Sequence, residues 1–138
     1  MKNFTFFGVR AVCFGATLLF IGLFNFVTTA DAETIKIVAL GASNTVGQGG
    51  SSYPAELQAM LTAKGYSVEV LNAGVDGDTT AGMLARVDSA VPSGTRLVLL
   101  NPANLNDNKA GIRGQQSGYV AQIKSKLTAR GIKVIVMA

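Results

Sequence analysis

Residues 35–50 read IKIVAL followed by GASNTVGQGG. The first six residues are almost continuously apolar, which predicts a buried strand. The next ten form a loop that is rich in glycine and carries hydroxyl groups. Open α/β sheets place ligands and reactive groups in such loops, at the carboxyl ends of their strands. Ser43, at the first bend, is therefore a candidate nucleophile, with a phosphate-loop residue and a plain turn residue as the alternatives.

Downstream of this stretch, apolar runs alternate with amphipathic segments, as in βα units that build a parallel sheet. We expect further strands at 67–72, 97–100 and 132–136, and helices at about 53–64, 80–90 and 115–130. Gly65 and Gly131 are predicted to cap two of these helices at their C-terminal ends. The inward-facing residues predicted from helical periodicity are Leu57, Met60, Leu61, Met83, Leu84, Val87, Tyr119, Ile123 and Leu127.

Polar segments follow the second and third strands, at 73–80 and 101–108. We predict both as loops, and parallel strands would bring them beside the loop at 41–50. The chain then reaches the apolar run 132–136 with no further helix or strand after it. A bare apolar edge strand invites aggregation. We therefore expect 33–138 to be a C-terminally incomplete domain, and a small natural four-stranded fold is the alternative.

The segment Met1–Ala32 resembles a secretory signal peptide. Lys2 and Arg10 supply its positive charge, an apolar run follows, and Ala30-Asp31-Ala32 offers a cleavage site. This pattern predicts a periplasmic or secreted protein without a stable membrane anchor after cleavage. An uncleaved anchor is the alternative, because the apolar run is close to the ~20 residues that a spanning helix needs.

Composition limits the binding partners. The whole chain has 12 basic and 8 acidic residues, and without Lys2, Arg10 and Asp31 the counts fall to 10 and 7, a net charge of +3. These charges are spread thinly, whereas a nucleic-acid site gathers Lys and Arg on one face. Residues 33–138 contain neither Cys nor His, which argues against a zinc or copper site.

Phosphate-binding motifs fit the Gly-rich stretch poorly. A Walker loop needs a Lys that is absent after Gly47, and the dinucleotide fingerprint should open directly into a helix. Acyl transfer fits better, because a serine nucleophile needs oxyanion donors about 3 Å from the reacting carbonyl oxygen. The backbone N–H of Ser43, a glycine N–H from the second loop and an Asn amide from the third would form such a set.

Three blocks, in order, resemble those of SGNH hydrolases, also called GDSL esterases: GASNT (41–45), NAGVDGDTT (72–80) and ND (106–107). The linking segments YPAEL (53–57) and LARVD (84–88) are similar to bacterial members of arylesterase and lysophospholipase/thioesterase type. The resemblance implies a three-layer α/β, flavodoxin-like fold with a parallel sheet. It also implies hydrolysis of small carboxylic esters or thioesters, without metal or organic cofactor.

By this resemblance Ser43 is the nucleophile and Gly77 donates its backbone N–H to the oxyanion. The third block supplies an Asn amide, from Asn106 or from Asn104, and both remain candidates. Taken singly, each of these residues has a plainer reading. Ser43 and Thr45 could bond the backbone of a turn, Asp76 and Asp78 could cap the next helix, and Asn72, Asn104 and Asn108 could be turn or strand-end residues.

The chain departs from the family pattern at two points. Ala42 stands where the Gly-Asp-Ser-Leu motif has Asp, which is neither nucleophile nor base. More seriously, the family's last block, Asp-x-x-His, supplies the general base, and this chain has no His at all. We therefore expect essentially no serine-esterase activity from the chain by itself. A non-catalytic fragment and a nucleotide-binding flavodoxin-like module are the alternatives.

Overall fold

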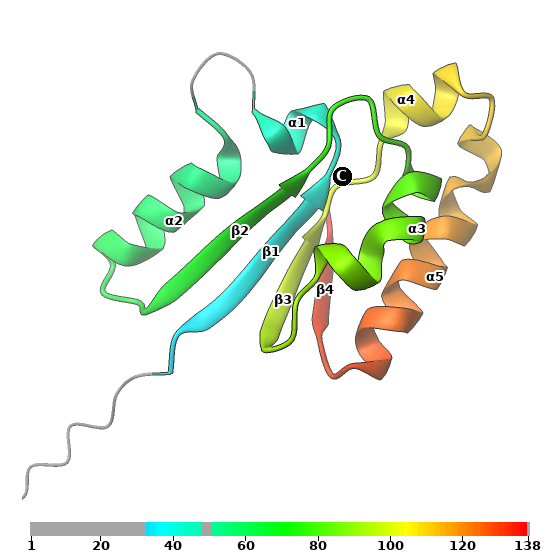
Figure 1. Ribbon diagram of the computed structural model, residues 1–138. Helices are drawn as coiled ribbons and strands as arrows, with labels where there is room; N and C mark the ends of the chain where they lie inside the picture. The colour runs from blue at the N-terminus through cyan, green and yellow to red at the C-terminus, as the bar shows by residue number, and fades with distance from the viewer. Residues whose placement is uncertain (1–32, 48–50, 138) are drawn as a thin grey trace, which may run out of the picture. The chain divides into compact units, whose positions relative to one another are not determined.

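The computed structural model describes residues 33–47 and 51–137, which form a parallel four-stranded sheet with helices on both faces (Figure 1). The strands are β1 (Ile35–Gly41), β2 (Val68–Gly74), β3 (Thr95–Leu100) and β4 (Lys133–Val136). Their order in the sheet is β2-β1-β3-β4, and every neighbouring pair is parallel. The predicted α/β fold with its parallel sheet is confirmed. The signal-peptide prediction for 1–32 lies outside the described residues.

The three longer helices occur where the sequence predicts them, as α2 (Tyr53–Ala63), α3 (Thr80–Ala90) and α5 (Gln116–Ala129). Gly65 and Gly131 follow two of them with φ of 84° and 75°, a left-handed conformation that favours glycine. Two short helices, α1 (Ser43–Val46) and α4 (Asn104–Lys109), arise in segments that we predicted as loops. A single 3₁₀ turn, η1 (Arg113–Gln115), precedes α5.

The main core lies between the sheet and the helices α3 and α5, which cover the same face (Figure 1). β1 is central, and its residues 37–41 are buried. From the helices, the core receives Met83, Val87, Ile123 and Leu127, all predicted as inward-facing. Leu84 packs against this core and is half-buried, whereas the half-buried Tyr119 is not part of it and its neighbour Val120 packs there instead. This core fixes the carboxyl ends of β1 and β3, from which α1 and α4 continue.

The opposite face is covered less completely. Helix α2 packs against β2 there, with Leu57 and Leu61 half-buried. Met60, which we predicted to face inward, is 56% exposed, because α2 lies over the β2 side of the sheet and leaves β3 and β4 uncovered. A groove of about 390 Å³ results, with Leu99, Ile135 and Met137 among its lining residues. Within residues 33–47 and 51–137, no helix combines the length and apolarity needed to cross a membrane.

Candidate active site

Ser43 is the first residue of α1 and follows β1 after a single intervening residue. Asn72 near the end of β2 holds this short helix, because its Nδ2 donates to the carbonyl oxygens of Thr45 (2.8 Å) and Val46 (3.3 Å). Gly74 permits the close contact of β2 with α1, since a Cβ at that position would lie 2.5 Å from the Val46 nitrogen. The sequence placed Asn72 at a strand end, and the structure shows that it positions the turn bearing Ser43.

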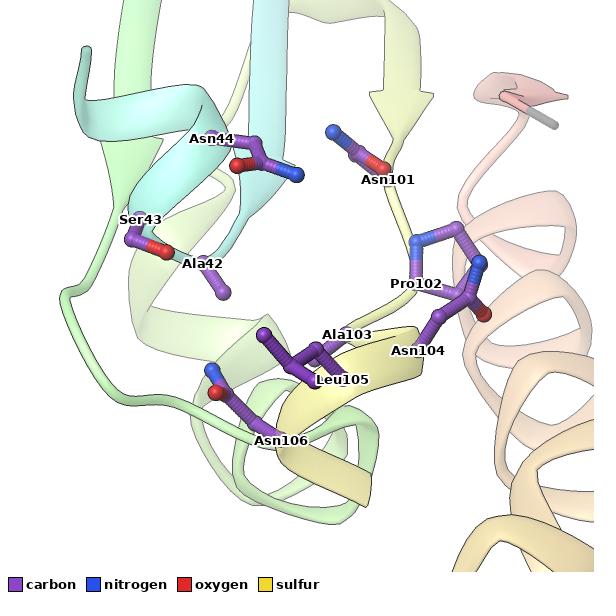
Figure 2. A pocket seen from close by; sticks show the side chains of 9 residues that line it. All are labelled: Ala42, Ser43, Asn44, Asn101, Pro102, Ala103, Asn104, Leu105 and Asn106. Carbon is purple, nitrogen blue, oxygen red and sulfur yellow. The ribbon is translucent and has the colours of Figure 1, made fainter. Parts of the chain in front are cut away.

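Ser43 opens onto a cavity of about 280 Å³ between the ends of β1 and β3 (Figure 2). The segment after β3 forms its other wall and includes Asn104 and Asn106. The lining residues are Ala42, Ser43, Asn44, Asn101, Pro102, Ala103, Asn104, Leu105 and Asn106. Amides and one hydroxyl supply the polar side chains of this lining, and none of its members has a titratable side chain. The cavity can therefore donate hydrogen bonds to an ester but cannot remove a proton from Ser43.

The two candidate asparagines lie differently around this cavity. In Figure 2 the Asn106 amide points toward the turn that bears Ser43, whereas the Asn104 side chain points away from that turn. Asn104 Oδ1 accepts a hydrogen bond from Arg113 at 2.6 Å, on an exposed part of the surface. Asn106 Nδ2 donates to the carbonyl oxygen of Asp78 at 2.7 Å. Because a primary amide carries two N–H groups, Asn106 keeps a second donor.

Gly77 lies in the exposed turn between β2 and α3, with φ of 71°. It is not among the lining residues of the Ser43 cavity. Among the described residues, no hydrogen bond uses the backbone N–H of Gly77 or of Ser43. The structure thus brings Ser43, Asn104 and Asn106 to one cavity and leaves Gly77 in the adjacent loop.

No protein-family model matches the chain. Esterase TesA of Pseudomonas aeruginosa is 31% identical over 110 residues, which are 78% of this chain and 55% of Esterase TesA. The crystal structure of AlinE4, an SGNH-hydrolase family esterase, superposes with a TM-score of 0.68 at 32% identity. In sequence and in fold, the chain is similar to SGNH-hydrolase esterases.

The match to AlinE4 covers 76% of this chain and 59% of AlinE4. A crystal structure of TesA gives a TM-score of 0.66 at 30% identity, over 73% of this chain and 58% of that one. The chain therefore spans little more than half the length of these relatives. The family predicted from the three sequence blocks is confirmed.

A buried carboxylate connects three helices beside the site, α3, α4 and α5. Asp107, in α4, is fully buried and accepts hydrogen bonds from Thr80 N (2.7 Å), Thr80 Oγ1 (2.6 Å) and Gln116 Nε2 (2.6 Å). Thr80 Oγ1 also accepts from the Ala103 N–H at 3.0 Å. Sequence reasoning used Asp107 only to mark Asn106 and missed this role. The only sign of this role in the sequence is the position of Asp107, a charged residue directly after the candidate Asn106.

Replacing Asp107 with alanine is expected to lower the free energy of unfolding by about 2–4 kcal/mol, because three donors in a buried site would lose their acceptor. Urea denaturation followed by circular dichroism measures this change. Asp88→Ala is the control, since Asp88 is exposed and pairs with Lys126 at the surface. An Asp107→Ala midpoint equal to that of the control would contradict the structural role of the buried carboxylate.

Two hydroxyls are buried without a hydrogen-bond partner among the described residues, Thr45 Oγ1 and Tyr53 OH. Burial raises the pKa of Tyr53 above its usual value, and the nearby Thr45 hydroxyl offsets this only in part, since the two groups form no hydrogen bond of normal geometry. The phenol of Tyr53 therefore stays protonated at neutral pH. It is no substitute for the base that Ser43 lacks.

The N-terminal cap of helix α3 is neither of the two aspartates that we considered for it. We considered Asp76 and Asp78 as caps, but the N-cap is Thr79, whose hydroxyl accepts from the Gly82 N–H at 3.0 Å. Asp78 instead accepts from the Thr79 N–H and forms an ion pair with Arg86, while Asp76 is exposed. The carboxylate of Asp78 therefore does not cap α3 and instead binds the side chain of Arg86 on that helix.

Proposed function

We propose that this chain carries the nucleophile and the oxyanion hole of an exported serine esterase that hydrolyses carboxylic ester or thioester bonds of small molecules. The observation that carries the proposal is that Ser43, after β1, and Asn106, after β3, line one cavity. The names of the relatives, Esterase TesA and the esterase AlinE4, support ester hydrolysis. Similarity of the linking segments to arylesterases and lysophospholipases or thioesterases suggests aryl esters, lysophospholipids and acyl thioesters as substrate classes.

In the proposed reaction, Ser43 Oγ attacks the carbonyl carbon of the ester and gives up its proton to a base. The negative charge then develops on the carbonyl oxygen, where preorganised N–H donors stabilise it. We assign these donors to the backbone N–H groups of Ser43 and Gly77 and to the Asn106 side chain. The alkoxide or thiolate leaves, and water hydrolyses the acyl-Ser43 ester to release the acid.

Asn106 is preferred over Asn104 for this role because of what each amide already contacts. The hydrogen bond from Asn106 to the Asp78 carbonyl fixes the orientation of its amide and leaves one N–H for an oxyanion. Asn104 accepts from Arg113 at an exposed position and points away from Ser43. Export rests on the sequence of residues 1–32 alone, and it would place the enzyme in the periplasm or outside the cell.

The test supplies the missing base from solution. Residues 33–138 are incubated with p-nitrophenyl acetate and 2-methylimidazole, whose methyl group hinders nucleophilic attack more than proton transfer. Mass spectrometry of proteolytic peptides then looks for an acetyl group on Ser43. Acidifying the sample at the end of the incubation preserves the acyl-enzyme, because its hydrolysis needs a base as well.

We expect acetylation of Ser43 that rises with the concentration of 2-methylimidazole, and none in the Ser43→Ala variant. Acetylation confined to surface lysines would overturn the assignment of Ser43. It would favour a non-catalytic binding module in place of an esterase.

A further inference from the structure

Arg86, on α3, bonds to the ends of β1 and β2 and to the loop that follows β2. Its Nη2 donates to the carbonyl oxygen of Gly41 at 3.0 Å, and its Nη1 donates to that of Ala73, also at 3.0 Å. Its Nε donates to Asp78 Oδ2 at 2.8 Å. The side chain is 23% exposed and does not line the cavity of Ser43. One guanidinium therefore ties the end of β1, the end of β2 and the loop after β2 to a single helix.

Two of these contacts are close in sequence to a proposed oxyanion donor. Gly41 lies two residues before Ser43, and its carbonyl oxygen also accepts from the Val75 N–H at 3.1 Å. Asp78 directly follows Gly77, and its backbone carbonyl accepts from Asn106. The three donors come from three separate segments, α1, the loop between β2 and α3, and α4. Each segment has a contact or a near neighbour in sequence that bonds to Arg86 or to its partner Asp78.

Gly82, in the first turn of α3, makes room for the ion pair between Asp78 and Arg86. A Cβ at Gly82 would lie 2.0 Å from Asp78 Oδ1, so this glycine leaves room for the carboxylate. The Asp78 side chain is only 11% exposed. A half-buried ion pair that also satisfies two strand-end carbonyls is a rigid arrangement, because the planar guanidinium holds its donors in a fixed fork.

We propose that Arg86 is a positioning residue, which holds the donors of the oxyanion hole in a fixed mutual geometry without touching the substrate. The inference rests on the proposed function of Ser43. Donors must lie 2.7–3.1 Å from the oxyanion, a general requirement of such sites, and a misplacement of about 1 Å can cost about 10²-fold in rate. Lysine could keep the charge of Arg86 but could not reach three acceptors in one plane.

The test compares Arg86→Lys and Asp78→Asn with the wild-type chain. Arg96→Lys is the matched control, because Arg96 lies on β3, is 68% exposed and pairs with Glu33 away from the cavity. One readout is the ¹H–¹⁵N spectrum, with the amides of Ser43 and Gly77 and the side-chain NH₂ of Asn106 as reporters. The other is the rate of Ser43 acetylation in 2-methylimidazole against ester concentration, with the unfolding midpoint of each variant measured alongside.

We expect both variants to shift the three reporter signals and to lower the maximal acetylation rate by about 10–10²-fold, with half-saturation at an unchanged ester concentration. Arg96→Lys should do neither. Reporter signals that match the wild type in Arg86→Lys and Asp78→Asn would overturn the proposal, as would a lower unfolding midpoint with unchanged acetylation of the folded protein. If Arg86→Lys does not fold, the isosteric Asp78→Asn decides.

The two proposals fail in different ways. An absence of Ser43 acetylation in the wild-type chain would remove the esterase assignment. The spectra would still show whether Arg86 orders the segments that carry Ser43, Gly77 and Asn106.

Discussion

Residues 33–138 by themselves should hydrolyse p-nitrophenyl acetate about 10⁴–10⁶-fold more slowly than Esterase TesA under the same conditions. The reason is the missing base: removal of the nucleophile or the base from a serine hydrolase typically costs a factor of this order. The chain contains no His, and no residue lining the Ser43 cavity has a titratable side chain. Release of p-nitrophenol, followed spectrophotometrically, measures the rate.

Ser43→Ala is the control for this measurement, and its rate should equal that of the unchanged chain, because an unactivated serine adds nothing to the background. A Ser43-dependent rate within about tenfold of that of Esterase TesA would show that a base exists elsewhere in the chain. The half-buried Tyr53 would be the first residue to test in that event. Since burial raises its pKa, any activity that depended on the Tyr53 phenolate would increase at strongly alkaline pH, and Tyr53→Phe would remove it.

The sequence predicted the sheet and the longer helices because their signals are local. The apolar run 35–40 and the spacing of Met83 and Val87 each report burial directly, and α3 begins and ends where the pattern places it. The short helices α1 and α4 were missed for a physical reason. Ser, Asn and Thr favour turns over helices, and both helices depend on distant side chains. Asn72 holds the C-terminal carbonyls of α1, and Thr80 binds Asp107 in α4.

The candidate site was predictable only in part for the same reason. The order of the three sequence blocks pointed to Ser43, Gly77 and an Asn of the third loop. Arg86 carried a weaker signal, a charged residue three positions after the inward-facing Met83 on one helix face. Its three acceptors come from segments up to 45 residues away in the sequence. The residues around Arg86 therefore could not predict these hydrogen bonds.

Asn106→Ala should lower the 2-methylimidazole-dependent acetylation rate of Ser43 by about 10²–10³-fold, the usual cost of removing one oxyanion-hole donor. The Asn106 amide faces the turn of Ser43 and is oriented by the Asp78 carbonyl, so its loss removes a donor that is already in place. Asn104→Ala is the matched variant, two residues earlier in the same helix, and should change the rate by less than about twofold. The unfolding midpoints of both variants separate rate effects from loss of fold.

A loss of stability in Asn106→Ala that accounts for the whole decrease in acetylation would contradict the donor role, because its bond to Asp78 would then be purely structural. The reverse pattern, a large decrease in Asn104→Ala and none in Asn106→Ala, would move the donor to Asn104. That result would require the Asn104 side chain to leave Arg113 and rotate toward Ser43 when an ester binds. Asn106→Asp distinguishes the electrostatic part of the effect, since a carboxylate of the same shape would repel the oxyanion and should slow acetylation at least as much as alanine does.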